Sequence, residues 1–124
     1  MARVVLTEDA REDLHDLDRS VQKQIVKALQ KLQDNPSQRG QPLGRRGDSN
    51  LTTFRKLVVG DRDYRIVYRV QDDGTIVVVW VIGRRADGEA YELALARLRM
   101  HTDNTVRELT GSLEELWRAR LDMQ

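Results

Sequence analysis

The sequence has 124 residues, 40% of them hydrophobic and 33% charged, which is typical of a single folded domain and excludes a disordered chain. It contains no cysteine, so disulfides and thiolate metal sites are excluded, and a reducing, cytoplasmic location is expected. No apolar run reaches the ~18 residues that a membrane helix needs, and the apolar part of the N-terminus is too short for a signal peptide.

Charge is distributed unevenly along the chain, although the net charge is only +1. Residues 8–18 contain six acids and one base, whereas residues 39–85 contain ten lysines or arginines and five acids. This asymmetry fits either two solvated faces of opposite sign or one surface that binds a polyanion.

Residues 3–6 are expected to form a short strand that leads into a helical hairpin. Thr7 offers a side-chain oxygen as an N-cap, and acids follow in the first turn. A break near residues 18–20 predicts two helices, and Asn35-Pro36 predicts the end of the second. The two helices share one apolar stripe, made of Ala10, Leu14, Leu17, Val21, Ile25, Leu29 and Leu32.

Residues 36–53 are rich in proline, glycine and small polar residues, so a loop is expected there. Three strands are predicted to follow, at residues 54–59, 64–71 and 75–82, connected by polar turns. The last of them is almost entirely β-branched or aromatic, which predicts a central strand that is buried on both faces. A helix is expected from about Glu89 to Arg99.

The C-terminal residues form a separate segment in this interpretation. Ser112 and Glu115 fit a capping box, and an apolar stripe at helical spacing follows, made of Leu113, Leu116, Trp117 and Leu121. We expect this helical extension to bury its stripe against the helical hairpin, where Leu14, Leu17, Val21 and Ile25 offer apolar neighbours. The chain is therefore divided into a domain of residues 1–99 and an extension of residues 100–124.

The predicted fold is α+β. The N-terminal strand joins a three-stranded antiparallel meander in one four-stranded sheet, and a C-terminal helix and the helical tail complete the chain. We expect the helices to cover one face of the sheet and to leave the other face open for function.

The usual catalytic sets are missing from the sequence. His15 and His101 do not stand at a metal-ligand spacing relative to acids, a cysteine nucleophile is excluded, and there is no phosphate-binding glycine loop. Neither a metal nor a cofactor is therefore expected. Arginines on the predicted strands remain, and strand alternation predicts that Arg55 and Arg65 meet on the open face. Such a cluster fits an anion, although arginines that simply solvate a sheet face fit the pattern too.

Four segments, in this order after a helical hairpin, resemble the RelE/ParE toxin superfamily over residues 2–99. They are Gly40-Gln41-Pro42-Leu43, Val59-Gly60-Asp61, Tyr64-Arg65-Ile66-Val67-Tyr68 and Gly83-Arg84-Arg85-Ala86-Asp87-Gly88-Glu89-Ala90-Tyr91.

This resemblance implies a set of site residues. Arg65, Arg85 and Tyr91 match catalytic positions of the family, and a basic residue early in the preceding strand matches Arg55, or Lys56 if the register shifts by one. The sequence departs from the RelE-like pattern because the residue two positions further on is Leu57 or Val58 and is not basic. RNA-binding roles are expected for the other basic residues of this region, Arg45, Arg46, Arg69 and Arg84.

The resemblance also implies a function. It predicts the toxin of a type II toxin–antitoxin system, a metal-independent endoribonuclease that cleaves mRNA on the ribosome and is neutralised by a cognate RelB-like antitoxin. The cleavage step would be attack of an RNA 2′-hydroxyl group on the adjacent phosphate, with Arg65 and Arg85 stabilising the extra negative charge. Two alternatives remain open, a ParE-like inhibitor of DNA gyrase and an interaction module of the same fold that has lost its activity.

Overall fold

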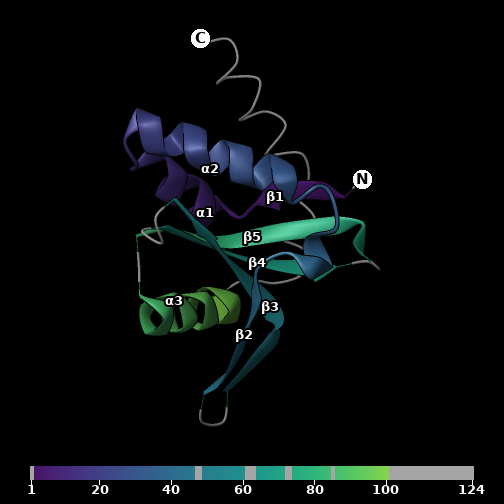
Figure 1. The fold of residues 1–124 in the computed structure, drawn as a ribbon. Coiled ribbons are helices and arrows are strands. Elements are labelled where there is room, and N and C mark those ends of the chain that lie inside the picture. The colour runs from purple at the N-terminus through teal and green to yellow at the C-terminus, as the bar shows by residue number, and fades with distance from the viewer. Residues whose placement is uncertain (1, 47–48, 61–63, 72–73, 85, 101–124) are drawn as a thin grey trace.

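The computed structural model describes residues 2–46, 49–60, 64–71, 74–84 and 86–100 (Figure 1). Five strands form one sheet in the order β1-β5-β4-β3-β2, which confirms the α+β class. The elements are β1 (Arg3–Leu6), α1 (Glu8–His15), α2 (Arg19–Lys31), the 3-10 helix η1 (Pro36–Gln38), β2 (Gln41–Arg46), β3 (Ser49–Val59), β4 (Tyr64–Gln71), β5 (Ile76–Gly83) and α3 (Asp87–Met100). The predicted capping box at Ser112 lies outside the described residues. No helix among the described ranges is long and apolar enough to cross a membrane.

The prediction of a loop over residues 36–53 is wrong, and the sheet has five strands instead of four. Strand β2 pairs antiparallel with the long strand β3, from Gln41 opposite Lys56 to Arg46 opposite Ser49. Pro42 and Gly44, which made this segment look like a loop, flank a register shift at the edge of the sheet. An edge strand tolerates both residues there, because its outer backbone groups need no partner within the sheet.

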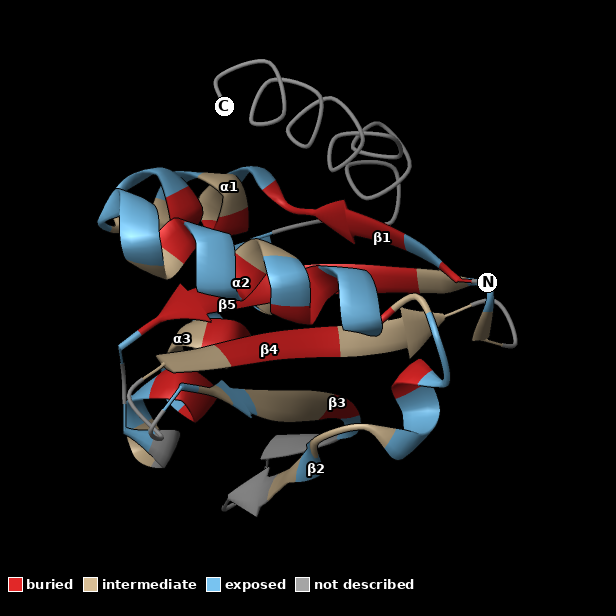
Figure 2. Ribbon diagram, turned by 45° about the horizontal axis from the view of Figure 1, so that its top comes forward, coloured by how far each residue is buried: buried red, intermediate tan, exposed pale blue. Residues whose placement is uncertain are grey.

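The helices cover both faces of the sheet, so the expectation of one open face is also wrong. Helices α1 and α2 lie on one side and α3 lies on the other (Figure 1). Strand β5 requires this arrangement, because Val77 and Val79 belong to the core beneath α1 and α2, whereas Val78 and Trp80 belong to the core beneath α3. Burial of β4 and β5 between the two layers is visible in Figure 2.

The helical hairpin begins as predicted and ends earlier. Thr7 caps α1 through its Oγ1 atom, which accepts a hydrogen bond of 3.1 Å from the backbone N–H of Ala10. Asp18 is the N-cap residue of α2, at the break expected near residues 18–20, and its side chain makes no capping hydrogen bond. Helix α2 ends at Lys31, and Asn35 then adopts a left-handed conformation with φ 52° before Pro36 starts η1.

A hydrogen-bonded junction around Tyr68 attaches the η1–β2 connection to the sheet. Tyr68 is buried, and its hydroxyl group donates to the backbone carbonyl oxygens of Arg39 (2.6 Å) and Pro36 (2.9 Å). Arg55 donates to the carbonyl oxygens of Arg39 (2.7 Å) and Gly40 (3.1 Å). Gly40 has φ +65°, and a Cβ atom there would lie 2.2 Å from the carbonyl oxygen of Lys56, so only glycine fits this close approach.

The same junction predicts a loss of stability in alkali. Burial raises the pKa of Tyr68, although the guanidinium group of Arg55 opposes this shift through a hydrogen bond and its charge. Below pH ~10 the phenol is neutral in both the folded and the unfolded chain, so its contribution to stability is fully present. As pH rises further the unfolded chain loses this proton first, and stability falls by at most about 1.4 kcal/mol per pH unit.

We expect Tyr68→Phe to remove this part of the alkaline slope. The variant should also lose about 1–3 kcal/mol at neutral pH, because carbonyl oxygens buried at the junction lose a donor. Urea unfolding of both chains between pH 8 and pH 11.5 measures the difference between their free energies of unfolding. The other tyrosines and the lysines titrate in both chains, so their contribution cancels in this difference. Parallel curves across this range would show that Tyr68 does not carry the effect.

Candidate functional site

Arg65 lies in β4 on the face of the sheet that α3 covers. It stands opposite Val58 of β3 on one side and opposite Gly83, the last residue of β5, on the other. Residues that face each other across paired strands share one side of the sheet, and Val67, the next residue of β4 on this side, is in the core beneath α3. Arg65 is half-buried, so the sheet holds this cation close to the ends of β3 and β5.

Two more cations lie on the same face of the sheet as Arg65. Lys56 stands opposite Val67, which places it diagonally across from both Arg65 and Arg69, with about 7–8 Å between neighbouring positions of this kind. Arg69 stands opposite Phe54, and its guanidinium carbon lies 5.4 Å from the centre of the Phe54 ring. We call Lys56, Arg65 and Arg69 the basic row.

The segment after β5 adds one described basic residue at the Arg65 end of this row. Arg84 follows Gly83 directly and is exposed. Arg85 lies outside the described residues. Tyr91 of α3 is only 1% exposed and packs in the core beneath α3 with Val67, Phe54 and Trp80. The tyrosine that the family resemblance singled out is therefore covered by the core in this structure.

The expectation that Arg55 and Arg65 meet is wrong. Arg55 stands opposite Tyr68, whose side chain belongs to the core beneath α1 and α2, so the two arginines lie on opposite faces of the sheet. The side chain of Arg55 is committed to the carbonyl oxygens of the junction described above. Of the two residues considered for this strand, Lys56 is the one on the face of Arg65.

The remaining predicted RNA-binding residues lie away from the basic row. Arg45 and Arg46 stand opposite Asn50 and Ser49, near the tip of the β2–β3 hairpin, which projects from the body of the sheet (Figure 1). The pairing of Gln41 with Lys56 marks the other end of this hairpin, about 20 Å away at the usual rise per strand residue.

An ion pair that the sequence did not reveal fixes α3 and the end of β5 beside the basic row. Asp13 of α1 accepts hydrogen bonds from Arg97 at 2.7 and 3.0 Å and from the backbone N–H of Ile82 at 3.0 Å. Arg97 also donates to the carbonyl oxygen of Trp80 at 2.8 Å. The side chains of Arg97 and Asp13 are only 13% and 12% exposed. We call this arrangement the Asp13–Arg97 clamp.

Asp13 belongs to the acid-rich residues 8–18, for which a solvated face is one interpretation, but Asp13 itself is largely buried. A signal was nevertheless present in α3, because Arg97 continues the helical spacing of Ala90 and Ala94, both of which are buried. An arginine on the buried stripe of a helix requires an acidic or carbonyl partner, which the clamp provides.

The part of the chain that the structure describes contains no group of three or more acidic or histidine side chains that could hold a metal. His15 is exposed on the last turn of α1. His101 belongs to the residues that the structure does not describe.

Comparison with known proteins places this geometry in context. Residues 4–88 match the family described as the ParE toxin of the type II toxin–antitoxin system parDE. The chain is 33% identical over 97 residues to a RelE-like toxin protein of Escherichia coli, with 78% of this chain and 97% of the relative covered.

Two solved structures of similar proteins have the same fold. A mutant of the Escherichia coli toxin RelE in the free state is 28% identical, with a TM-score of 0.61 and coverage of 78% of this chain and 98% of that chain. A chain of the toxin–antitoxin complex RelBE2 from Mycobacterium tuberculosis is 29% identical, with a TM-score of 0.57 and coverage of 68% and 98%.

We expect Arg97→Ala to destabilise the protein by about 3 kcal/mol, because the substitution leaves the largely buried Asp13 carboxylate without its cation. Arg99→Ala is the matched control, since Arg99 is exposed in the same last turn of α3. Its effect should stay within about 0.5 kcal/mol. Urea unfolding of the two variants measures both values, and equal midpoints would show that the clamp does not stabilise the fold.

Proposed function

Because the chain belongs to the RelE/ParE superfamily of type II toxin–antitoxin toxins, we propose that it is an endoribonuclease that cleaves mRNA on the ribosome. The observation that carries this proposal is the basic row, with Arg84 exposed at its Arg65 end. Guanidinium and ammonium groups on one face of a sheet can form charge-assisted hydrogen bonds with a phosphate group. Messenger RNA supplies such groups at each nucleotide.

A cognate antitoxin of the RelB type is the proposed partner that neutralises the activity, and the cytoplasm is the proposed location. Support for this partner comes from the similar RelBE2 structure, which is described as a toxin–antitoxin complex. Growth of the producing cell requires such a partner if the free chain cleaves mRNA.

In the proposed reaction the 2′-oxygen of a nucleotide attacks the adjacent phosphorus and the 5′-oxygen of the next nucleotide leaves. The 2′-hydroxyl group gives up its proton, the 5′-oxygen gains one, and the products carry a cyclic phosphate and a free 5′-hydroxyl group. The phosphorane between them bears two negative charges. Arg65, together with Arg85, stabilises this charge through hydrogen bonds that are strongest in the transition state. The nucleophile is part of the RNA, so no metal-activated water is required.

Lys56 is the residue that we propose for proton transfer. An arginine is unsuitable because its pKa exceeds ~12. Tyr91, which matches a catalytic position of the family, is buried in the core beneath α3, and Arg55 is on the opposite face of the sheet. Lys56 is half-buried on the face of Arg65, at diagonal distance from it.

The other basic residues are proposed to bind the RNA backbone on either side of the cleaved phosphate. Arg69 is the last member of the row at one end, and Arg84 follows β5 at the Arg65 end. Arg45 and Arg46 stand near the tip of the β2–β3 hairpin. Contacts of this kind add affinity and depend on salt, with little preference for sequence.

A ParE-like inhibitor of DNA gyrase is the second candidate function, and three observations favour it. The matching family model is that of ParE toxins, and Tyr91 is not exposed to a substrate. Val58, an apolar residue that is 39% exposed beside Arg65, also fits a module that binds a partner without cleaving RNA.

Expression of the free chain separates these functions. We expect growth to stop with new 5′ ends appearing in translated mRNA before DNA supercoiling changes, since cleavage acts on translation directly. Primer extension on several mRNAs and plasmid topoisomer gels, sampled together over time, measure the order of events. Loss of supercoiling with intact mRNA would establish the gyrase inhibitor instead.

Within the endoribonuclease proposal, Arg65→Ala should reduce cleavage on ribosomes by a factor of about 10²–10³, which is the usual effect of removing one charge-stabilising donor. Lys23→Ala is the control, because Lys23 is exposed on α2, on the other side of the sheet. Single-turnover cleavage rates at saturating enzyme separate this effect from weaker binding. A rate for Arg65→Ala equal to that of the control would remove Arg65 from the site.

A further inference from the structure

The exposed side of α2 carries cations at a regular spacing. Four of its residues recur at every fourth position and are all exposed, namely Arg19, Lys23, Lys27 and Lys31. We call these four residues the α2 cations. The helix contains no acid, and its other exposed residues are neutral and polar, namely Ser20, Gln24 and Gln30. A helix rises by about 1.5 Å per residue, so the α2 cations extend over about 18 Å.

Acids flank the α2 cations along the sequence without pairing with them. Asp18 directly precedes the helix, and Asp34 follows its end by three residues. No carboxylate among the described residues forms an ion pair with an α2 cation. Asp61 and Asp63 of the turn between β3 and β4 lie outside the described residues. Within the part of the chain that the structure describes, the α2 cations can therefore offer their charge to an external anion.

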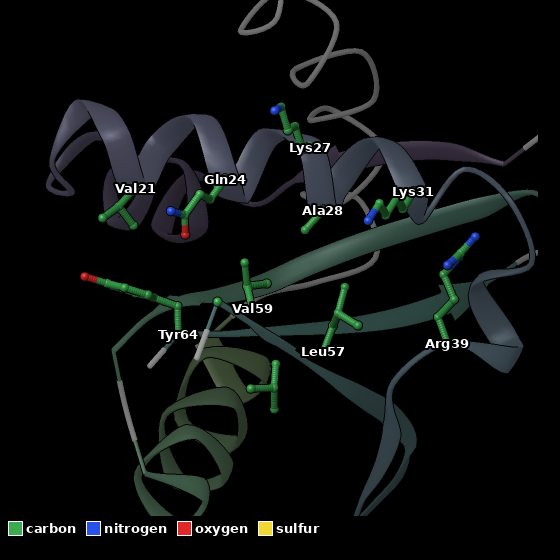
Figure 3. A pocket seen from close by; sticks show the side chains of 11 residues that line it. Val21, Gln24, Lys27, Ala28, Lys31, Arg39, Leu57, Val59 and Tyr64 are labelled. Atoms are coloured by element: carbon green, nitrogen blue, oxygen red, sulfur yellow. The ribbon is translucent and has the colours of Figure 1, made fainter. Parts of the chain in front are cut away.

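Arg39 adds a guanidinium group at one end of this helix. Together with Lys27 and Lys31 it lines a groove between α2 and β3, and Lys31 and Arg39 lie at the same end of that groove (Figure 3). The Nε atom of Arg39 donates to the backbone carbonyl oxygen of Asp34 at 2.7 Å. Its own carbonyl oxygen accepts from the hydroxyl group of Tyr68. These bonds hold Arg39 in place, and a guanidinium group is well suited to binding phosphate.

The composition of this face favours a nucleic acid over a protein as the partner. Protein interfaces are depleted in lysine and usually contain apolar or aromatic anchors. The exposed residues of α2 include no apolar or aromatic side chain. Arginine, lysine, serine and glutamine are instead the side chains that bind the phosphate and sugar oxygens of nucleic acids.

The way α2 packs favours duplex RNA over duplex DNA. Ile25 and Leu29 bury the opposite side of the helix in the core, so only one face of α2 reaches the surface (Figure 2). A helix that reads B-DNA enters the deep major groove, which requires it to project from the protein. The minor groove of an RNA duplex is wide and shallow and displays 2′-hydroxyl groups, so a helix lying flat on the protein can contact it.

We propose that the exposed face of α2, with Arg39, binds the sugar–phosphate backbone of an RNA duplex across its minor groove. The α2 cations and Arg39 bind phosphates, and the neutral residues between the cations bind 2′-hydroxyl groups. This surface is separate from the basic row, because α2 and α3 cover opposite faces of the sheet and Arg65 is on the face of α3. One chain can thus hold a folded RNA on one side and a single strand on the other.

The inference does not depend on the proposed cleavage, because binding to α2 uses no residue of the basic row. A lost backbone contact weakens binding and leaves the single-turnover rate at saturating enzyme unchanged, so Lys23→Ala still serves as the control for cleavage.

Substitutions at the end of α2 near Arg39 test this surface. All chains carry Arg65→Ala, so that the assay reports binding alone. A chain with Lys27→Gln and Lys31→Gln is compared with one that carries Arg99→Glu, which lowers the net charge by the same two units on the exposed end of α3. Glutamine is close to lysine in helix propensity, so the helix is retained. Fluorescence anisotropy of a labelled RNA duplex, measured over a range of salt concentrations, gives the affinities.

We expect the double variant to bind the duplex about tenfold more weakly at low salt, with a salt slope smaller by about 2, or about 1 for each lost phosphate contact. The Arg99→Glu chain should keep the slope of the parent. Lys27→Arg with Lys31→Arg should keep both affinity and slope, because the charges remain.

Three results would overturn the proposal. Equal losses in the double variant and the Arg99→Glu chain would show that net charge alone accounts for binding. Equal affinity for a DNA duplex of the same sequence, with the same loss in the double variant, would show that α2 does not select RNA. Tighter binding of polyglutamate than of the duplex would assign this face to an acidic protein. Weaker binding confined to the double variant and to the RNA duplex supports the proposal.

Discussion

Strand β5 has no polar face, and the layers of the molecule follow from that property. Val77, Val79 and Ile82 require a cover on one side, which α1 and α2 provide. On the other side a register shift in the β4–β5 pairing lets Trp80 and Val81 both pack beneath α3. A strand that is apolar on both sides is stable only between two layers, so the order of layers is dictated by this one segment.

The same constraint places the chemistry at the end of the sheet. The core beneath α3 occupies the middle of β4 and β5, so a charged group on that face remains accessible only where the strands end or where β3 diverges. Arg65 stands at such a position, beside Gly83. The Asp13–Arg97 clamp holds the end of β5 from the other side by bonding the N–H of Ile82 and the carbonyl oxygen of Trp80. The paired strands already fix the backbone of these cationic residues, so little further backbone entropy is lost when a phosphate binds. Binding is favoured because the site is preorganised.

Local patterns predicted much of this architecture, and pairing between distant segments accounts for most of what they missed. Strands β1 and β4, the helical hairpin and the Thr7 cap follow from alternation, helical spacing and capping chemistry, all of which act within a few residues. Strand β2 was missed because Pro42 and Gly44 are tolerated only through the edge position that pairing creates. Likewise, alternation separates Phe54 from Arg55 correctly, but only the register with β4 decides which of them shares a face with Arg65. The ion pair between Asp13 and Arg97 spans 84 residues of sequence, beyond any local pattern.

The parallel pairing of β1 with β5 has a consequence for the order in which the chain acquires its structure. Arg3 stands beside Ile76, so the first strand must wait for one of the last before it can pair. Contacts of such long sequence separation carry a large loop-closure entropy and form slowly. Because synthesis starts at the N-terminus, the helical hairpin can fold early. The neighbours of Arg65 on β5, and the helix α3, are synthesised later. The basic face is therefore assembled late in biosynthesis, and a nascent or truncated chain carries the arginines without the surface that aligns them.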